Sequence, residues 1–268
     1  FNSYGLKLNN YENIKYNFLP ATNLKIKNAN ISIRSDSLKI DVGNLIIYPK
    51  LLNIYNNEDF KEKKIILNKN NILLDISDFK ILINYIYNLK NKLTFKKLDL
   101  QINRKNKFLT NIEEIDYSNY GFNKGIIKGK LFNKKFKILL SDNNKKINFK
   151  FLKTGITADI NFNKIKNDSV INGFFKTKLL NSKLKFNFEY DGKKIKIYNS
   201  YFRNKYLSFN NHSTITYNPF FYVRSVFNID DINKDFLKIV DYKKILSSKY
   251  FLKKINTKNE INFKSKKF

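Results

Sequence analysis

The sequence predicts a mainly β protein, in which an elongated, twisted antiparallel sheet folds into an open groove and carries two short amphipathic helices. Apolar and polar residues alternate with a period of two along most of the 268 residues, which is typical of strands with one apolar face. Phe and Tyr make up 16% of the chain, so apolar burial can offset the entropy of ordering it. Helical periodicity is confined to two segments. These observations exclude disorder for most of the chain.

The strands are marked by alternation and by turn residues. In residues 24–33 the alternation slips by one residue near Asn28, which predicts a bulge or kink. Asp191-Gly192 separates two alternating runs and is the strongest short-range hairpin signal, so these runs should pair antiparallel. The other alternating segments are residues 38–42, 98–102, 147–151, 156–162, 184–190, 195–197 and 221–229.

Two segments follow a helical period instead. Residues 78–91 should form a helix that begins at Ser77 or Asp78, and residues 231–247 should form a second one. Both are too short and too charged to span a bilayer, which takes about 20 mostly apolar residues. Their inward positions are Phe79, Leu82, Ile83, Ile86 and Leu89 in the first, and Ile232, Phe236, Ile239, Val240 and Ile245 in the second.

No linker or change of composition divides the chain, so residues 1–268 are predicted to form a single elongated β-rich region. Two short helices cannot cover the apolar face of about ten strands. The sheet must therefore fold onto itself, or leave an apolar trough for an apolar ligand.

The predicted trough is lined by apolar residues at inward positions of the second half of the chain. The same residues are also compatible with an ordinary sandwich core. They are Ile156, Ile160, Phe162, Leu184, Phe186, Phe188, Ile195, Ile197, Phe221, Val223 and Phe227.

The charge is extreme, with 52 Lys and Arg against 22 Asp and Glu, a net charge of +30. Such a charge could bind nucleic acid, but only four of the basic residues are Arg, and the lysines are scattered along strand faces. Lys, Asn, Ile, Phe and Tyr are the residues that AT-rich codons encode. We therefore favour compositional drift and solvated strand faces over a nucleic-acid site, while anionic lipid headgroups remain compatible partners.

Little in the sequence suggests catalysis, a metal or a cofactor. There is no Cys, and the single His212 has no clustered ligands, so it is interpreted as a turn or surface residue. The acidic cluster of Glu113, Glu114 and Asp116 is interpreted as a solvated loop or helix start. Gly129-Lys130 is followed by Leu131, which excludes a phosphate-binding loop. The protein is predicted to be non-enzymatic, with no catalytic residues and no metal.

Three stretches give the chain a resemblance to a known family. They are the strand with a following proline in residues 38–52, the helix of residues 78–91 with the strand at 93–102, and the Pro-initiated strand of residues 217–232. In this order they resemble the AsmA family of bacterial envelope proteins, a branch of the bridge-like lipid-transfer superfamily. The chain would be an internal fragment from an AT-rich genome.

The resemblance implies a role in lipid transport. A periplasmic protein, anchored to the inner membrane by an N-terminal helix that is absent here, would shield phospholipid acyl chains between the inner and outer membranes and support outer-membrane assembly. The alternatives are a basic nucleic-acid-binding protein, a transmembrane β-barrel of the outer membrane, and a self-packed scaffold for protein partners. The lipid, the direction of transport and the protein partners are not predicted.

Overall fold

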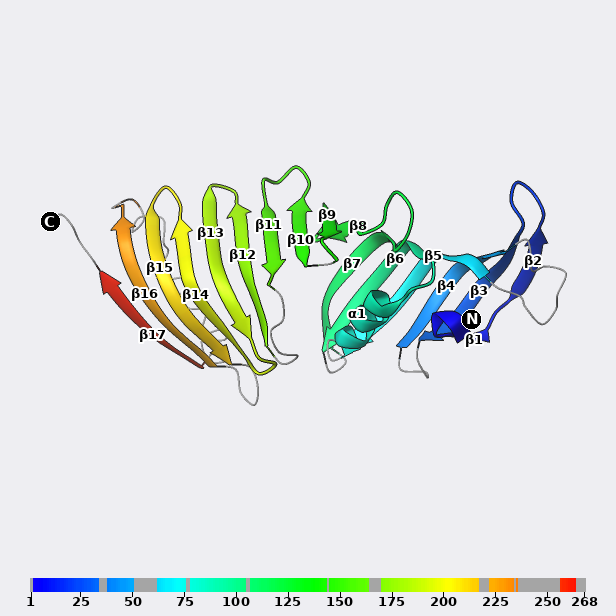
Figure 1. Ribbon diagram of the computed structural model, residues 1–268, viewed down its shortest axis with the longest axis horizontal. Coiled ribbons are helices and arrows are strands. Elements are labelled where there is room, and N and C mark those ends of the chain that lie inside the picture. Colours follow the sequence, from blue (N-terminus) through cyan, green and yellow to red (C-terminus); the bar gives the residue numbers. More distant parts are fainter. Residues whose placement is uncertain are drawn as a thin grey trace. The chain divides into compact units, whose positions relative to one another are not determined.

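The computed structural model describes residues 2–33, 38–50, 62–75, 78–104, 107–143, 145–163, 170–216, 222–233, 235 and 256–263 (Figure 1). Most of these residues lie in β-strands, which confirms the predicted mainly β class. Backbone contacts divide the chain into unit 1, Phe1–Leu139, and unit 2, Leu140–Phe268.

Unit 1 is an open sheet in the order β2-β3-β4-β5-β6-β7-β8-β9, with β1 also paired to β3. Its elements are η1 (Asn2–Tyr4), β1 (Leu6–Asn10), β2 (Asn13–Asn17), β3 (Asn23–Ile33), β4 (Leu38–Pro49), β5 (Glu62–Asp75), α1 (Phe79–Asn88), β6 (Leu93–Arg104), β7 (Lys107–Ser118), β8 (Ile126–Leu131) and β9 (Lys134–Ser141).

Unit 2 is also an open sheet, and its strands follow one another in chain order. They are β10 (Lys146–Phe151), β11 (Thr157–Phe162), β12 (Ile171–Leu179), β13 (Ser182–Tyr190), β14 (Lys194–Arg203), β15 (Leu207–Thr216), β16 (Tyr222–Ile232) and β17 (Asn256–Phe263). The predicted Asp-Gly hairpin is confirmed, because β13 and β14 pair antiparallel across Asp191 and Gly192.

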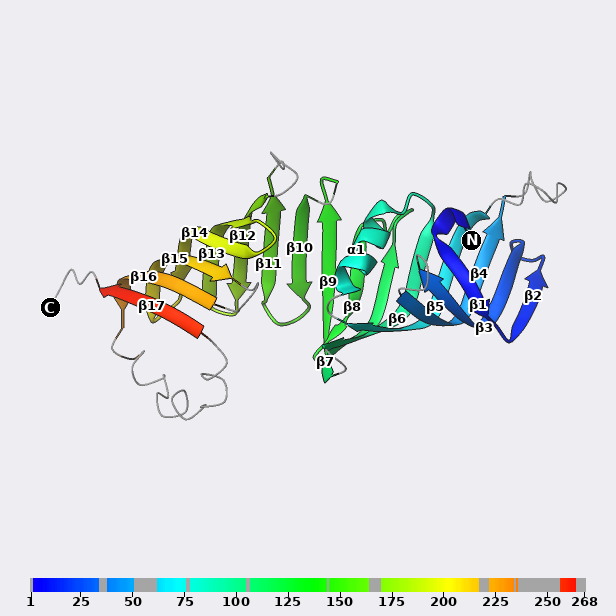
Figure 2. The same ribbon diagram turned by 90° about the horizontal axis from the view of Figure 1, so that it is seen from below.

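The sheets are mixed, so the prediction of a purely antiparallel sheet was wrong. β5 and β6 run parallel, and so do β16 and β17. A parallel pair needs a crossover of a dozen or more residues, and α1 lies in the crossover between β5 and β6 (Figure 2). The strand–helix–strand order around residues 78–91 therefore indicates a parallel pair of strands. The prediction had assumed that consecutive strands form hairpins, which are antiparallel.

The first predicted helix is present as α1, and its inward side is larger than predicted. Leu82 is buried as expected, Ile86 and Leu89 pack against the core, and Tyr85 is buried as well. Asp78 is the N-cap residue, but its side chain makes no capping hydrogen bond. The other two predicted inward residues are Phe79 and Ile83, whose side chains are outside the described part of the structure.

The second predicted helix is not among the described elements. Its predicted start at residue 231 lies within β16, which continues to Ile232, so that start was wrong. Residues 236–247 lie outside the described residues. Across the described ranges, no helix is long and apolar enough to cross a membrane.

Unit 1 has a closed apolar core. Helix α1 contributes Leu82 and Tyr85 to the buried face of β3 to β7, and Tyr4 of η1 and Leu6 of β1 add to the same cluster. The strand residues of the core are Ile26, Ala29, Ile31, Ile33, Leu38, Ile40, Val42, Leu45, Ile47, Ile65, Leu67, Ile72, Leu74, Leu93, Phe95, Leu98, Leu100 and Ile115.

The predicted slip near Asn28 is confirmed, and it is part of a line of slips that crosses unit 1. Asn28 has a φ of 47°, and Ile26 and Ala29 on either side of it are both buried. β4, β5 and β6 change phase in the same way, and their unbroken register places these slips beside one another. β7 slips on the other side of the Leu98–Ile115 pair, with shifts in its register against β6. β3 to β6 therefore keep their register while both halves of each strand face one core. The other residues with positive φ on this line are Lys69, Lys97 and Glu114.

A buried amide supports this line of slips. Asn70 of β5 is fully buried, and its Nδ2 donates to the carbonyl oxygen of Leu67 at 2.9 Å and to that of Lys96 at 3.2 Å. Carbonyl groups that leave the regular ladder at a bulge need such partners, because an unpaired buried carbonyl is costly.

Burial of Tyr4 makes the stability of unit 1 decrease at alkaline pH. Burial, with smaller effects of Glu62 and Tyr120, raises the pKa of Tyr4 to about 12, from 10.0. The folded state therefore holds this proton more tightly, so the stabilisation is complete below pH 10 and is lost as the pH rises toward 12. We expect Tyr4→Phe to remove this loss, so that the stability difference between variant and parent changes by about 1 kcal/mol per pH unit in this window. Urea unfolding at pH 9 to 11.5 measures it. Tyr11→Phe at an exposed position is the control, and an equal change there would contradict the assignment to Tyr4.

Candidate functional site

Most apolar side chains of the unit 2 strands lie on one face of the sheet. The strand register makes Ile160, Phe175 and Phe186 direct neighbours on β11, β12 and β13. Paired residues on adjacent strands point to the same side, so such rows join into one continuous surface. We call it the unit 2 apolar face. It comprises Ile147, Phe149, Ala158, Ile160, Phe162, Ile171, Gly173, Phe175, Thr177, Leu184, Phe186, Phe188, Tyr190, Ile195, Ile197, Phe202, Phe209, Ile215, Val223, Phe227 and Ile229.

Most residues that the sequence predicted to line a trough are brought together on this face. Ile156 lies in the turn between β10 and β11, where its carbonyl accepts a hydrogen bond from the Phe151 N–H. Phe221 lies outside the described residues. On the face itself are Ile160, Phe162, Leu184, Phe186, Phe188, Ile195, Ile197, Val223 and Phe227.

The predicted trough set left out four phenylalanines of this face, namely Phe149, Phe175, Phe202 and Phe209. In β12, Phe174 and Phe175 are adjacent, so alternation alone did not show which one points inward. In β14, Asn199 has a φ of 49° and the register shifts, which moves Phe202 to the apolar side. Phe209 was missed because β15 carries mostly polar residues, although its pairing with Phe202 would have indicated it.

The face is not covered by the described part of unit 2. Every described member of the predicted set is half-buried, and none of its larger apolar side chains belongs to the buried core, which lies in unit 1. The elements described in unit 2 are strands of one sheet, with no second layer among them. A sandwich core would show side chains buried from both sides, so this arrangement favours an accessible face.

The side chains of the face pack laterally against one another. The rings of Phe175 and Phe186 stack with centroids 4.8 Å apart, and those of Phe202 and Phe209 stack at 4.9 Å. Phe162 meets Phe188 edge to face at 6.0 Å. Aromatic pairs in these geometries add roughly 0.5–1.5 kcal/mol each beyond burial. The face is therefore a continuous aromatic layer with one side open.

A short polar strip crosses this layer on β14, β15 and β16. The Ser200 hydroxyl donates to the Asn211 carbonyl oxygen at 2.6 Å, and Asn211 Nδ2 donates to the Ser213 hydroxyl. The Ser213 and Ser225 hydroxyls lie 2.7 Å apart. These serines are small and buried beneath their larger neighbours. Because the strip satisfies its own hydrogen bonds, it does not require water on the apolar face.

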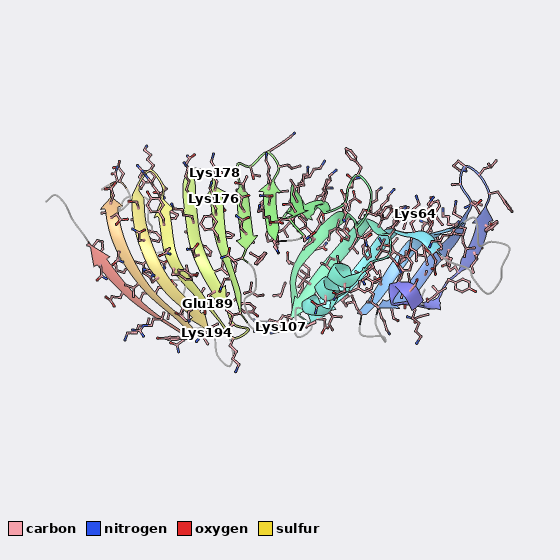
Figure 3. The ribbon with its side chains drawn as sticks, viewed as in Figure 1. Lys64, Lys107, Lys176, Lys178, Glu189 and Lys194 are labelled. Atoms are coloured by element: carbon pink, nitrogen blue, oxygen red, sulfur yellow. The ribbon has the colours of Figure 1, made fainter. Side chains whose placement is uncertain are left out.

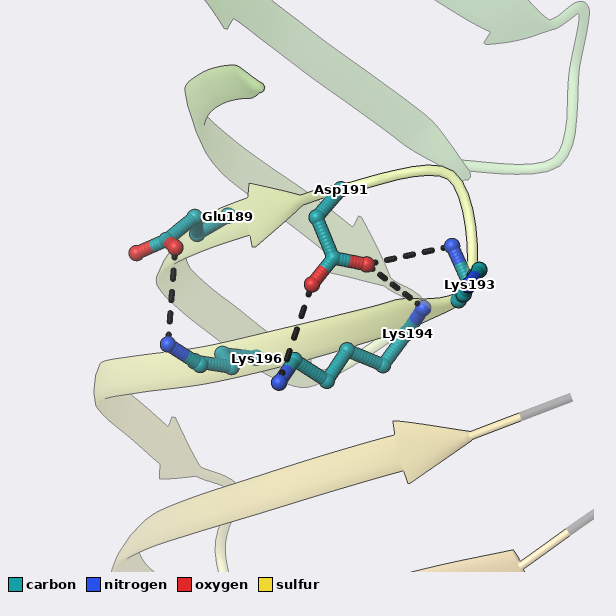
Figure 4. Close-up of polar contacts among 5 residues, drawn as sticks. All are labelled: Glu189, Asp191, Lys193, Lys194 and Lys196. Carbon is teal, nitrogen blue, oxygen red and sulfur yellow. Dashed lines mark hydrogen bonds and ion pairs between the residues drawn. The ribbon is translucent and has the colours of Figure 1, made fainter. Parts of the chain in front are cut away.

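Ion pairs lie along one edge of the unit 2 sheet, at the turn between β13 and β14 (Figure 4). Lys196 Nζ lies 3.4 Å from Glu189 Oε1, and Lys194 Nζ lies 3.7 Å from Asp191 Oδ2. The backbone N–H groups of Lys193 and Lys194 both donate to Asp191 Oδ1, and they lower the pKa of the Asp191 carboxyl group. Asp191 thus acts in forming the turn.

The remaining polar residues show no reactive constellation. His212 is exposed on the polar side of β15. The acidic cluster lies in β7, so its interpretation as a loop or helix start was wrong. There Asp116 accepts the Lys97 N–H at 3.0 Å, and Glu114 lies 2.6 Å from Lys130 Nζ. Among the residues that the structure describes, no group of three or more His, Cys, Asp or Glu side chains could hold a metal ion.

Two surface clefts are lined by described residues of unit 1. One, of about 310 Å³, is lined by Lys96, Lys97, Lys128 and Asp116, with the Thr94 and Ser118 hydroxyls 3.1 Å apart beside it. The other, of about 650 Å³, is lined mainly by polar side chains. The lining residues of both clefts all belong to unit 1, and the unit 2 apolar face is an open surface.

Comparison with protein-family models, with curated proteins and with solved structures finds no match for this chain. The properties of the unit 2 apolar face are therefore the basis of the functional argument.

Proposed function

We propose that this protein is non-enzymatic and shields phospholipid acyl chains on the unit 2 apolar face during transport between membranes. The observation that carries the proposal is a continuous layer of partly exposed Phe, Ile and Leu side chains with no described element across it. Soluble proteins rarely expose so large an apolar surface without a partner for it.

The energetics favour an extended apolar guest. A lipid that leaves a bilayer exposes its acyl chains at a cost of about 0.8 kcal/mol per CH₂ group, and contact with aromatic and aliphatic side chains recovers much of that cost. The aromatic layer runs from β10 to β16, and such a surface suits a long, flexible chain. No covalent step is needed.

The opposite face suits an aqueous surrounding. Its strand positions carry mostly Lys, Asn, Thr and Glu, for example Lys176, Lys185 and Asn187. A resemblance to AsmA-like proteins supports the same function, and on that basis we propose that the protein acts in the periplasm of a bacterium and that the full-length protein is anchored to the inner membrane. In that setting, the protein would support outer-membrane assembly.

The test uses two adjacent residues on opposite faces. Phe175→Asp places a charge on the apolar face, whereas Phe174→Asp makes the same change on the polar face, since Phe174 pairs with Asn187. Purified protein is extracted with organic solvent, and bound phospholipid is measured by mass spectrometry. We expect Phe175→Asp to lose most of the bound lipid and Phe174→Asp to keep it, with both variants folded by circular dichroism. Absence of phospholipid from the parent protein, or equal lipid in all three, would overturn the proposal.

A further inference from the structure

Three turns of unit 2 lie on the same side of its sheet, where β10, β12 and β14 end. These are the turns between β10 and β11, between β12 and β13, and between β14 and β15. We call the two sides of the sheet at which the strands end its edges, and this one the first edge. The opposite edge holds the turn with Asp191. Figure 3 shows Lys176 and Lys178 toward the first edge, and Glu189 and Lys194 toward the other.

The tips of these turns expose leucines. Leu152 follows β10 and is 39% exposed, whereas Leu179, the last residue of β12, and Leu180, which follows it, are 46% and 65% exposed. The first and third turns also carry Lys153 and Lys205. Leucine at the tip of a hairpin adds nothing to turn formation, which favours Gly, Asn, Asp and Pro. These side chains therefore suggest an apolar contact outside the chain.

Cations line the same edge in register. Lys178 is directly opposite Lys183, and Lys183 is directly opposite Arg203, so three positive charges occupy adjacent strands. One step inward, Lys176 is opposite Lys185. None of these five has an ion-pair partner among the described residues. Like charges directly opposite each other are destabilising, so this arrangement favours an anionic partner.

The two edges of unit 2 differ in how many of their basic side chains form ion pairs. The Asp191 edge pairs Lys194 and Lys196 with carboxylates, and Lys146 lies 3.8 Å from Asp142 there. On the first edge, Asp159 of β11 is directly opposite Lys176 but accepts a hydrogen bond from Asn148 and forms no ion pair with that lysine. The acidic residues Asp230 and Asp231 lie at the end of β16, beyond the row of cations on β12 to β14. Cations that lie opposite one another on adjacent strands without ion pairs are therefore concentrated on the first edge. We call this part of the edge the leucine–lysine rim, which comprises Lys150, Leu152, Lys153, Lys176, Lys178, Leu179, Leu180, Lys183, Lys185, Arg203 and Lys205.

We propose that the leucine–lysine rim binds the surface of a bilayer that contains anionic phospholipid. Leucines at the turn tips would enter the boundary between headgroups and acyl chains, and the lysines behind them would lie at the level of the phosphates. Nucleic acid would also attract the cations, but it offers no apolar phase to three exposed leucines. The proposal does not require that the unit 2 apolar face bind acyl chains.

The test is vesicle co-sedimentation of the whole chain. We expect binding to vesicles with 30 mol% phosphatidylglycerol in phosphatidylcholine to be at least about tenfold tighter than to phosphatidylcholine alone, and to weaken with salt. The double variants Lys178→Glu with Lys183→Glu, and Leu179→Asp with Leu180→Asp, should each weaken binding by about tenfold or more. All four positions are exposed, and Asp tolerates the positive φ of 54° at Leu180, so the fold should persist.

The matched control makes the same charge change on the other edge. Lys145→Glu with Lys193→Glu alters two exposed lysines there and should change vesicle binding by less than about twofold. Equal loss in this control would show a general charge effect and overturn the proposal. Loss with the lysine variant but not the leucine variant, together with binding of a 30-nucleotide single-stranded RNA to the same lysines, would make the rim a nucleic-acid surface. Bound lipid measured after extraction is a separate readout, so failure of the rim and failure of the apolar face can be told apart.

Discussion

Replacing Phe95 with Ala is expected to lower the free energy of unfolding by about 3–5 kcal/mol. The side chain of Phe95 is 1% exposed and lies in the core that α1 closes over β3 to β7. Its removal leaves a cavity that neighbouring strands cannot fill, because their register is held on both sides of the slip line. Urea unfolding followed by circular dichroism measures the loss, and hydrogen exchange of the β5 to β7 amides locates it.

The matched variant is Phe186→Ala on the unit 2 apolar face. Phe186 is half-buried and stacks on Phe175, with solvent on its other side, so its truncation should cost only about 1–2 kcal/mol. The contrast tests whether the apolar layer of unit 2 is accessible. A loss at Phe186 as large as that at Phe95 would mean that something covers this face, and the lipid proposal would lose its main support.

The local features of this fold were largely predictable, because period-two alternation is a direct property of a half-buried strand. β3, β10 and β13 follow their alternating segments closely, and Asp191-Gly192 gave the β13–β14 hairpin. The parallel pairs were not predicted, since the direction of a strand depends on where its crossover returns. That information lies in tertiary packing and not in the alternation of the strands themselves.

The slips in alternation show a second limit of prediction from sequence. The one at Asn28 was visible, because Asn is common at positive φ, whereas the slips at Lys69, Lys97 and Glu114 carry residues with no such preference. Lys69 and Lys97 lie in register with the slips of β3 and β4, so these slips are cooperative, and Glu114 lies where β7 shifts its register against β6. A single strand read alone cannot reveal this cooperation.

The candidate site was predictable to the extent that its strands alternate regularly. The inward residues of β11 and β13 were found, and Phe202 behind the slip at Asn199 was not. The leucine–lysine rim could not be predicted at all. Its members are distant in sequence, and only the pairing of β10 through β15 brings their turns to one edge.

Gly173→Val should destabilise unit 2 by about 3 kcal/mol, although Val is the better strand former. A Cβ atom at Gly173 would lie 2.4 Å from Phe188 Cζ and 2.7 Å from the Asn161 carbonyl oxygen. The ring of Phe188 thus rests on the bare backbone of the neighbouring strand, and any side chain displaces it. Gly129 and Phe136 form the same arrangement in unit 1, with a Cβ-to-Cζ distance of 2.9 Å. If strand propensity decided the outcome, Val would raise the free energy of unfolding at both glycines. A lower free energy of unfolding would instead indicate the steric conflict.

A double-mutant cycle with Phe188→Ala tests this cause of the effect. Removing the ring relieves the contact at 2.4 Å but leaves the one with the Asn161 carbonyl, so the two changes together should cost at least about 1 kcal/mol less than their sum. Phe188 is also a predicted lipid contact. Gly173→Val should therefore lower the bound phospholipid by displacing the ring, without adding charge. Urea unfolding of the four proteins gives the coupling energy, and additive losses would show that the ring and the glycine are independent. In that case, the close fit of Phe188 over Gly173 could not be what holds the aromatic layer in its present arrangement.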